Sequence, residues 1–500
     1  MAASSRIVPF VILLALLLGV PGAQAQEPTP AVPDQPQPAC ITNLPPVVNA
    51  TITPRRVVYL GSASGAGARV VLEAYKSQDP EGQPLLYSFD VDGDGSFTDF
   101  SIPSAAAELI TMPGPWVAAA RVLDPLGAIG VQPFHMDARR FRASTFANSR
   151  GAPSAVAIVA GRPAVVIQSG PGFQFAINDQ ADGGGRWDMS AVLPIDWSMQ
   201  GPTVDAPCPL AVWLGHPHLV CAHVAKGGAL VLTHATNTLP DGSGTWDTGK
   251  LIQVRSDPAP TLGAAGDGLY LAYFQDRALT LLRYGSRPLD AVVVGRGFEL
   301  LWSTDVGSAP PASHSAVISV GDPPVLPAIA YLDAAKGQLV YAVNQKSDGR
   351  GRWDLVVVEP QQGDIGTPSL AMIGGRPAIA YRDGRKGYLK IAVAANPDGR
   401  GAWKVSVVDA TTKPGGTRVQ SLAEIDGRAG IAYEHETRGL LFAYDPERPT
   451  ADYWPAAAIG APPVPFTDGR YHLNPSLALV AGRPAIVYYS VDGMQFATAR

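Results

Sequence analysis

Residues 368–408 read PSLAMIGGRPAIAYRDGRKGYLKIAVAANPDGRGAWKVSVV. Gly374-Gly375 lies between two apolar runs, and a glycine pair in that position is a strong signal for a tight β-hairpin. Two further runs, 388–393 and 403–408, are separated by the turn residues Asp398-Gly399-Arg400-Gly401. The stretch therefore predicts four short strands joined by three turns.

The same pattern recurs from about residue 139 to the end of the chain. A proline opens the second predicted strand at Pro163, Pro217, Pro327, Pro377 and Pro484. A turn of the form Asp-Gly-x-Gly-x-Trp separates the third and fourth predicted strands at Asp182–Trp187, Asp241–Trp246, Asp348–Trp353 and Asp398–Trp403. Two other copies carry Gly268 and Ala429 in place of the proline, so the sequence holds seven copies in all.

Four-stranded units that recur at intervals of roughly 50 residues are typical of a β-propeller. The last copy ends after three strands, and the strand-like stretch 140–146 before the first copy has no other place. We expect this stretch to complete the last blade, which closes the ring and removes its sheet edges. The prediction is an all-β fold with a seven-bladed propeller over residues 139–500. Rings of six or eight blades stay open as alternatives, because 289–295 and 298–304 compete as the outer strand of the irregular third copy.

Residues 45–138 predict a separate small β-sandwich, with strand-like runs at 57–60, 70–74, 85–89 and 116–122. Asp79-Pro80-Glu81-Gly82, the run from Tyr87 to Gly95, and Asp124-Pro125-Leu126-Gly127 after the last strand resemble the PKD (polycystic-kidney-disease) family of immunoglobulin-like domains. The family usually has Trp where Phe89 stands. The resemblance implies a spacer or adhesive module rather than a catalytic domain.

Asp90, Asp92 and Asp94, followed by Gly95, match the first half of a calcium-binding loop. Alternating carboxylates can converge on one cation, and glycine permits the sharp turn. The twelfth position of such a loop should be a glutamate, but it is Ser101 here. A structural Asp-Gly turn and a bound calcium ion both remain open, and no other cofactor is expected.

The N-terminus predicts export. Arg6, the apolar run 8–20 and Ala23-Gln24-Ala25 have the order of a secretory signal peptide over residues 1–25. A proline-rich linker follows over 26–44, and no later segment is apolar enough to span a membrane. We therefore expect a secreted protein, located in the periplasm, on the cell surface or outside the cell.

Composition narrows the class of partner. Glycine and proline account for 53 and 47 of the 500 residues, which disfavours a helical protein. The charged fraction is 16% and the net charge is −5, so the sequence offers no basic footprint for nucleic acid.

Three cysteines are present: Cys40 in the linker, and Cys208 and Cys221 in the second copy of the repeat. The hairpin register of residues 368–381, moved back by 160 residues, places Cys208 opposite Cys221. Export into an oxidising compartment therefore predicts a cross-strand disulfide between them. The alternative is a pair of small buried thiols.

Candidate ligand-binding residues lie in the loops between the second and third predicted strands, because these loops share one face with the connections between blades. The candidates are Asp333, Lys336, Asp383, Arg385, Glu434, His435 and Asp492. A turn-forming role is the simpler interpretation of Asp333 and Asp383. His435 breaks the repeat and is the least explained of the set.

The Asp-Gly-x-Gly-x-Trp turns resemble the Asp-box of sialidase-like propellers, with one extra residue between Asp and Trp. In that family the boxes are structural and lie away from the active site. The recurring Arg162, Arg376 and Arg483 belong to hairpin turns and do not form the arginine triad of a sialidase. No nucleophile elbow, phosphate-binding loop or zinc motif is present. We expect a non-enzymatic binding or surface module for an extracellular glycan or protein, with no catalytic residues assigned; a sialidase-like hydrolase is the alternative.

Overall fold

The computed structural model describes residues 43–63, 65–147, 153–169, 172–194, 208–225, 228–254, 259–265, 268–275, 278–286, 298–308, 317–323, 325–333, 335–360, 367–412, 420–445, 454–460 and 474–500. The predicted signal peptide, nearly all of the predicted linker, and Cys40 lie outside these residues. The chain divides into two compact units, residues 1–43 and 44–500, and the strands that the structure describes belong to the second. Within the described ranges, no helix has the length and apolarity that a membrane crossing requires.

Two sheets near the N-terminus pack around one apolar core. The first sheet has the order β1 (Thr51–Thr53), β3 (Ala68–Glu73) and β5 (Ala105–Ile110). The second joins β4 (Leu86–Asp90), β6 (Gly114–Leu123) and β7 (Ile129–Ala147), and β2 (Val57–Leu60) pairs with β7 in parallel. Val58, Val70, Leu72, Ala118 and Ala120 are fully buried between these sheets.

Six four-stranded sheets follow, each with its strands in sequence order. The first three contain β8 (Pro153–Val159), β9 (Arg162–Ser169), β10 (Gly172–Asn178) and β11 (Trp187–Pro194); β12 (Leu210–Trp213), β13 (His216–Val224), β14 (Leu230–Asn237) and β15 (Trp246–Val254); β16 (Thr261–Ala265), β17 (Gly268–Gln275), β18 (Ala278–Ser286) and β19 (Phe298–Ser308).

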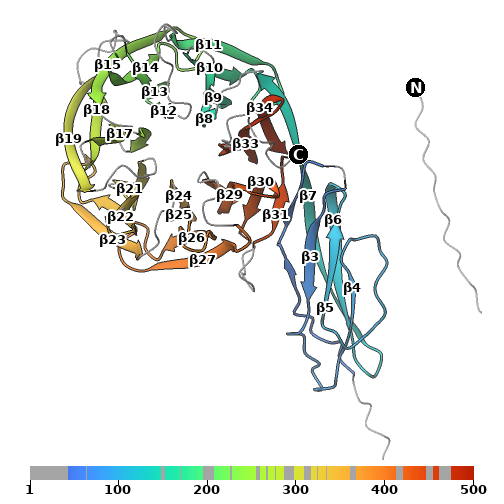
Figure 1. Ribbon diagram of the computed structural model, residues 1–500. Coiled ribbons are helices and arrows are strands. Elements are labelled where there is room, and N and C mark those ends of the chain that lie inside the picture. Colours follow the sequence, from blue (N-terminus) through green and yellow to red (C-terminus); the bar gives the residue numbers. More distant parts are fainter. Residues whose placement is uncertain are drawn as a thin grey trace, which may run out of the picture. The chain divides into compact units, whose positions relative to one another are not determined.

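The next three contain β20 (Ile318–Val320), β21 (Leu326–Asp333), β22 (Gln338–Asn344) and β23 (Trp353–Glu359); β24 (Ser369–Ile373), β25 (Arg376–Arg382), β26 (Leu389–Ala394) and β27 (Trp403–Asp409); β28 (Gln420–Ile425), β29 (Arg428–His435), β30 (Gly439–Tyr444) and β31 (Ala456–Ala458). The sheets stand around a circle with the first strand of each toward the centre, which is the architecture of a β-propeller (Figure 1). The fold is all-β, as the repeat predicts. Of the two stretches that compete for the third outer strand, 298–304 belongs to β19, and 289–295 lies outside the described residues.

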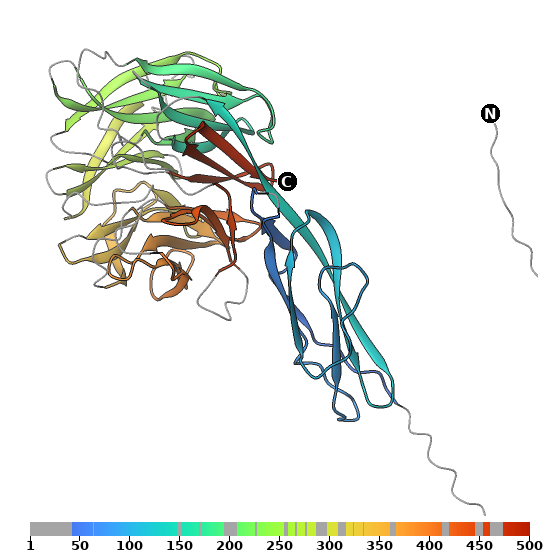
Figure 2. The ribbon, with the colours of Figure 1, turned by 45° about the vertical axis from the view of Figure 1, so that its right-hand side comes forward.

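A further sheet contains β32 (Ser476–Val480), β33 (Arg483–Ser490) and β34 (Gly493–Ala499). Its neighbour beyond β34 is β7, whose residues 141–147 pair with 494–499. The same strand pairs with β6 through residues 129–138, so β7 is one continuous element of both sheet systems (Figure 2). The expected domain boundary between residues 138 and 139 therefore falls inside a strand.

Each Asp-Gly-x-Gly-x-Trp turn lies where its own sheet packs on the sheet before it, as the turn at 398–403 shows. Trp403 contacts the Tyr341 ring in the preceding sheet at 5.0 Å between centroids, and the Tyr341 hydroxyl donates to the Asp398 carbonyl at 2.9 Å. Gly399 lies so close to the same ring that a Cβ atom there would stand 2.4 Å from it, and its φ is +77°. The invariant spacing of the turn thus joins neighbouring sheets.

Cys208 and Cys221 form a disulfide, which confirms the sequence prediction. The register of β12 and β13 pairs Leu210 with Leu219, and two further steps along both strands reach the two cysteines. Their Cα atoms are 4.2 Å apart. Counting along the repeat was sufficient here, because a hairpin register is fixed by the length of its turn.

Five of the hairpins that join first and second strands have two-residue turns in which both residues have positive φ. Gly374-Gly375 satisfies this without strain, but the corresponding residues in another sheet are Leu214, at φ +50°, and Gly215. A leucine in the left-handed region costs free energy, since its Cβ atom crowds the backbone. Its side chain is 62% exposed and contributes little packing in return.

We therefore expect Leu214→Asn to raise the free energy of unfolding by about 0.5–1 kcal/mol, because asparagine tolerates the left-handed conformation. Urea unfolding followed by fluorescence measures the change. Leu479→Asn is the control, because Leu479 is also exposed but lies within the extended strand β32. A Leu214→Asn protein no more stable than the wild type would contradict the prediction.

Candidate functional site

The turns between second and third strands lie at the same edge of each sheet as the end of its outer strand, because neighbouring strands run antiparallel. The name loop face is used here for this edge of three consecutive sheets. It comprises the turns after β21, β25 and β29 and residues 409–412 at the end of β27. Six of the seven candidate residues lie on it, and the structure buries four of those six.

Asp333 and Asp383 hold their turns in shape. The Asp383 Oδ1 atom accepts hydrogen bonds from the backbone N–H groups of Arg385 and Lys386, at 2.9 and 3.1 Å. Asp333 accepts one from Lys336 at 3.2 Å. Both carboxylates are buried, so they shape the loop face without forming its surface.

His435 occupies the turn position that is aspartate in the two preceding sheets. Like those aspartates, it accepts hydrogen bonds from backbone N–H groups of its turn. Its Nδ1 atom accepts from the backbone N–H groups of Thr437 and Arg438, at 3.2 and 3.3 Å. Its Nε2 atom lies 3.0 Å from the Thr411 hydroxyl. Because Nδ1 accepts, the neutral ring carries its proton on Nε2 and donates it to Thr411.

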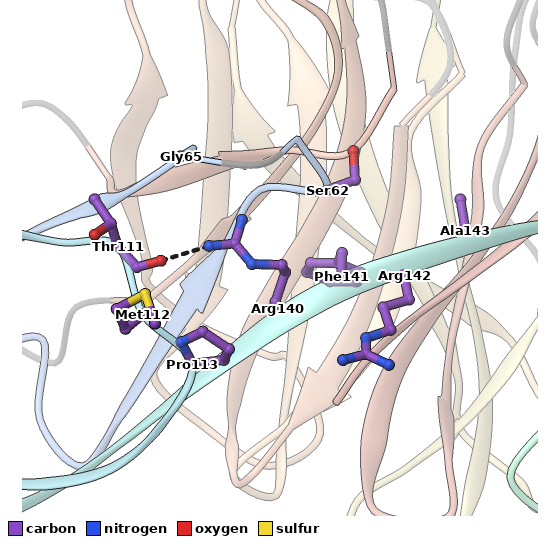
Figure 3. Close-up of a pocket in the computed structure, with 9 residues that line it drawn as sticks. All are labelled: Ser62, Gly65, Thr111, Met112, Pro113, Arg140, Phe141, Arg142 and Ala143. Carbon is purple, nitrogen blue, oxygen red and sulfur yellow. Dashed lines mark hydrogen bonds between the residues drawn. The ribbon is translucent and has the colours of Figure 1, made fainter.

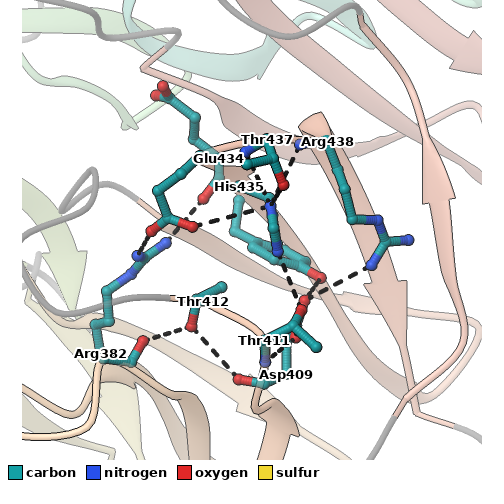
Figure 4. A network of polar contacts seen from close by, with 11 residues as sticks. Arg382, Asp409, Thr411, Thr412, Glu434, His435, Thr437 and Arg438 are labelled. Carbon is teal, nitrogen blue, oxygen red and sulfur yellow. Dashed lines mark hydrogen bonds and ion pairs between the residues drawn. The ribbon is translucent and has the colours of Figure 1, made fainter.

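Asp409 is the fully buried centre of the network in Figure 4. One of its oxygens accepts from the hydroxyl and the N–H of Thr411, at 2.5 and 2.8 Å, and the other from the Tyr433 hydroxyl at 2.7 Å. The Arg438 guanidinium is 4.0 Å away. Tyr433, Asp409, Thr411 and His435 thus form one hydrogen-bonded chain between two sheets.

The preceding pair of sheets carries a related arrangement. The Tyr381 hydroxyl donates to Glu359, the last residue of β23, just as the Tyr433 hydroxyl donates to Asp409, the last residue of β27. The Lys390 ammonium lies 2.8 Å from both Glu359 and Asp383. Burial alone would raise the pKa of Asp383, but the hydrogen bond and charge of Lys390, together with the backbone hydrogen bonds from Lys386 and Arg385, hold the pKa below its usual value.

Arg382 and Glu434 occupy the same place in successive sheets, directly after the repeated tyrosine, where the sheet before them has Leu332. The Arg382 guanidinium contacts the Glu436 carboxylate at 2.6 Å and the Glu434 carbonyl at 2.8 Å. Both side chains are buried. Charged residues are rarely buried unless they are paired, so these two mark the sector where the repeat departs most from its pattern.

Four residues of the site were not predicted from the sequence: Arg382, Lys390, Asp409 and Thr411. A comparison of copies would have found Arg382, since its counterpart Leu332 is apolar. Asp409 is the last residue of the outer strand and Thr411 lies just beyond it, and no repeated motif covers these positions. Asp492 is exposed on the turn after β33, where its backbone N–H donates to the Ser490 hydroxyl at 3.2 Å.

The arrangement does not suit acid–base catalysis at Thr411. A general base needs a free lone pair directed at the hydroxyl, whereas the Nε2 atom of His435 bears a proton and Nδ1 is already occupied by two N–H groups. Burial lowers the pKa of His435 and outweighs the opposite effect of Asp409 and Glu436. The ring is therefore neutral at pH 7 and acts as a fixed acceptor within the turn.

The predicted calcium residues do lie together: one oxygen from each of Asp90, Asp92 and Asp94 falls within 4.8 Å of the others. Asp90 is buried, and its two oxygens accept from the N–H groups of Gly93 and Gly95, at 2.7 and 3.1 Å. These bonds are those of a structural turn, and calcium binding at the three aspartates stays a prediction.

A separate cavity of about 820 Å³ lies beside β7, lined by Thr111, Met112, Arg140 and Arg142 among others (Figure 3). The Arg140 guanidinium donates to the carbonyls of Gly61, Ala63 and Thr111. These hydrogen bonds hold the β2–β3 and β5–β6 connections against β7. The Arg140 guanidinium that lines this cavity therefore has a structural role.

Comparisons with known proteins find remote resemblances only. No protein-family model and no curated protein matches the chain. An auxiliary nutrient binding protein from Bacteroides thetaiotaomicron is 9% identical over 91% of this chain and 98% of its own, with a TM-score of 0.38. A Hadza microbial sialidase is 9% identical over 91% and 93%, with a TM-score of 0.38. The six-bladed lectin of Aleuria aurantia is 12% identical over 74% and 98%, with a TM-score of 0.34. Similarities this remote carry no inference about function.

Proposed function

We propose that the protein is an exported, non-enzymatic binding module for a glycan or protein ligand, and that the loop face is its binding surface. The supporting observation is the buried network around Asp409, in which charged and hydroxyl groups from two sheets satisfy one another. The network holds Thr411, Thr437 and Arg438 in place at the surface. A surface that is rigid before binding loses little conformational entropy when a ligand arrives.

The sialidase-like alternative requires arginines that converge on one site. Arg162 donates to the Asp241 carbonyl at 2.9 Å, in a turn at the opposite edge from the loop face. Arg376 and Arg483 occupy the same hairpin position in their own sheets. These positions support binding over hydrolysis.

We also propose the finer architecture that the repeat predicts. The six four-stranded sheets together with β32, β33, β34 and β7 support a closed ring of seven blades. The two-sheet unit before it supports a PKD-like spacer over residues 45–138. The disulfide and the predicted signal peptide support export, with the mature protein outside the cytoplasm.

A glycan array, pull-downs with extracellular proteins and assays with fluorogenic glycosides test the proposed function together. Thr437→Tyr places a bulky ring on the loop face, and we expect it to weaken binding at least tenfold. Thr245→Tyr is the matched control, because Thr245 is equally exposed in a turn at the opposite edge. Glycoside turnover that one carboxylate substitution abolishes would overturn the non-enzymatic proposal, and equal binding by both variants would overturn the assignment of the surface.

A further inference from the structure

On the loop face the negatively charged side chains are buried or half-buried, whereas the positively charged ones reach solvent. The carboxylates of Asp333, Asp383 and Asp409 are buried, as described above. The cations of the same turns reach solvent: Arg385 and Lys386 are exposed, and the side chains of Lys336 and Arg438 are 67% and 37% accessible. In the described part of these three turns no carboxylate is exposed, although the whole chain has a net charge of −5.

The buried carboxylates do little to cancel this surface. Asp383 is neutralised from within by Lys390, and Glu436 is held by the buried Arg382 at 2.6 Å. Two cations have a buried carboxylate nearby: the Lys336 ammonium lies 3.2 Å from Asp333, and the Arg438 guanidinium lies at the longer distance of 4.0 Å from Asp409. Arg385, Lys386 and Arg438 therefore carry most of the positive charge that a ligand meets.

These cations belong to one continuous surface. The Thr412 hydroxyl donates to the carbonyl of Gly387, which ties the end of β27 to the turn that holds Arg385 and Lys386. Three residues earlier, Asp409 lies 4.0 Å from the Arg438 guanidinium in the next turn. The two turns are therefore joined through four residues of one strand end.

An aromatic ring lies in the same place. Tyr388 is half-buried and closes the turn after β25, and the Lys386 ammonium is 5.6 Å from its ring centroid. The corresponding residue, which pairs with the first residue of the turn, is Gln338, Gly439 and Gly493 in three other sheets. A tyrosine offers an apolar face and a polar tip, which suits a pyranose ring, and the exposed Thr437 adds a hydroxyl group.

We infer that the ligand of the loop face is an acidic polysaccharide, with carboxylate or sulfate groups bound by Arg385, Lys386 and Arg438 and a sugar ring packed on Tyr388. The inference rests on the proposed binding function and adds the charge of the ligand. Guanidinium groups pair well with carboxylate and sulfate oxygens. Nucleic acid fits less well, because its dense phosphates call for many more cations than these turns supply.

Binding of the full mature protein to polygalacturonate and to heparin tests the inference, with carboxyl-reduced polygalacturonate as a neutral polymer of the same backbone. We expect binding to at least one acidic polymer, a loss of at least tenfold between 25 and 250 mM NaCl because salt screens exposed charges, and at least tenfold weaker binding to the neutral polymer. The triple variant Arg385→Gln/Lys386→Gln/Arg438→Gln should lose at least tenfold.

The matched control is Arg186→Gln/Arg350→Gln/Arg352→Gln, which removes three exposed arginines from the Asp-Gly-x-Gly-x-Trp turns at the opposite edge. It should bind as the wild type does. Equal loss in both triple variants, or equal binding of reduced and unreduced polymer, would overturn the inference, and so would tighter binding to single-stranded DNA. A neutral glycan bound at Thr437 would leave the proposed function standing and remove only the acidic ligand, whereas no binding to any glycan or protein would remove both.

Discussion

Replacing Asp409 with alanine should lower the free energy of unfolding by roughly 3–4 kcal/mol, because hydrogen bonds to a charged group contribute about 1.5–3 kcal/mol each. The substitution removes the acceptor of the Tyr433 and Thr411 hydroxyls and of one backbone N–H. Tyr433 is buried, so its hydroxyl has no route to water. Urea unfolding monitored by circular dichroism measures the loss.

Asp348→Ala is the control for this prediction. Asp348 also accepts a backbone N–H, from Arg350 at 3.0 Å, but it lies in an accessible turn where water can replace the carboxylate. A cap of that kind is worth about 1 kcal/mol. If Asp409→Ala cost no more than Asp348→Ala, the network around Asp409 would not be a stabilising centre of the loop face.

Much of the architecture could be predicted from the sequence because it depends on local spacing. The two-residue hairpins fix the register of first and second strands, and this carried the prediction from Gly374-Gly375 to the disulfide of Cys208 and Cys221. The Asp-Gly-x-Gly-x-Trp turns could also be predicted from the sequence, since their six residues are contiguous.

What the sequence did not reveal depends on contacts between residues that lie 24 to 54 positions apart in the chain. Arg382 reaches Glu436 across a sheet boundary, and Tyr433 reaches back to Asp409. No local pattern marks either pair. The same holds within the turns: Asn178, the last residue of β10, binds the carbonyls of Gly183 and Gly185, yet it lies outside the repeated six-residue motif.

The continuity of β7 was hidden for a different reason. The sequence shows a strand-like stretch near 140–146, and an isolated sandwich is expected to end before it. Residues 137–140 pair with β2 while 141–147 pair with β34. A strand can serve two sheets when its hydrogen-bonding partners change along its length, and composition carries no sign of that change.

Acidification from pH 7 to pH 5 should cost the folded protein about 4 kcal/mol through two histidines, at about 1.4 kcal/mol per pH unit for each. His218 and His234 are buried, with the His218 Nδ1 atom 3.1 Å from the His234 Nε2 atom and their rings stacked. Burial lowers the pKa of His218 to about 3, with His234 acting in the same direction, and burial lowers the pKa of His234 to about 4.

The direction of this effect follows from where the protons bind. An unfolded histidine takes up its proton near pH 6.5, whereas the folded pair stays neutral until about pH 4. Between these values acid favours the unfolded chain, so stability is complete above about pH 6.5 and falls as the pH decreases. Urea unfolding at half-unit intervals from pH 7.5 to 5 measures the slope.

A double variant separates this pair from other acid-sensitive groups. His218→Asn keeps a polar atom where Nδ1 stands, His234→Gln keeps one where Nε2 stands, and neither new side chain titrates. The variant should lose most of the slope and retain the part due to His223 and His435, whose pKa values are also lowered by burial. Because the paired nitrogens are 3.1 Å apart, two positive charges there would repel strongly. An unchanged slope in the double variant would mean that the pair is already protonated in the folded state, which this geometry opposes.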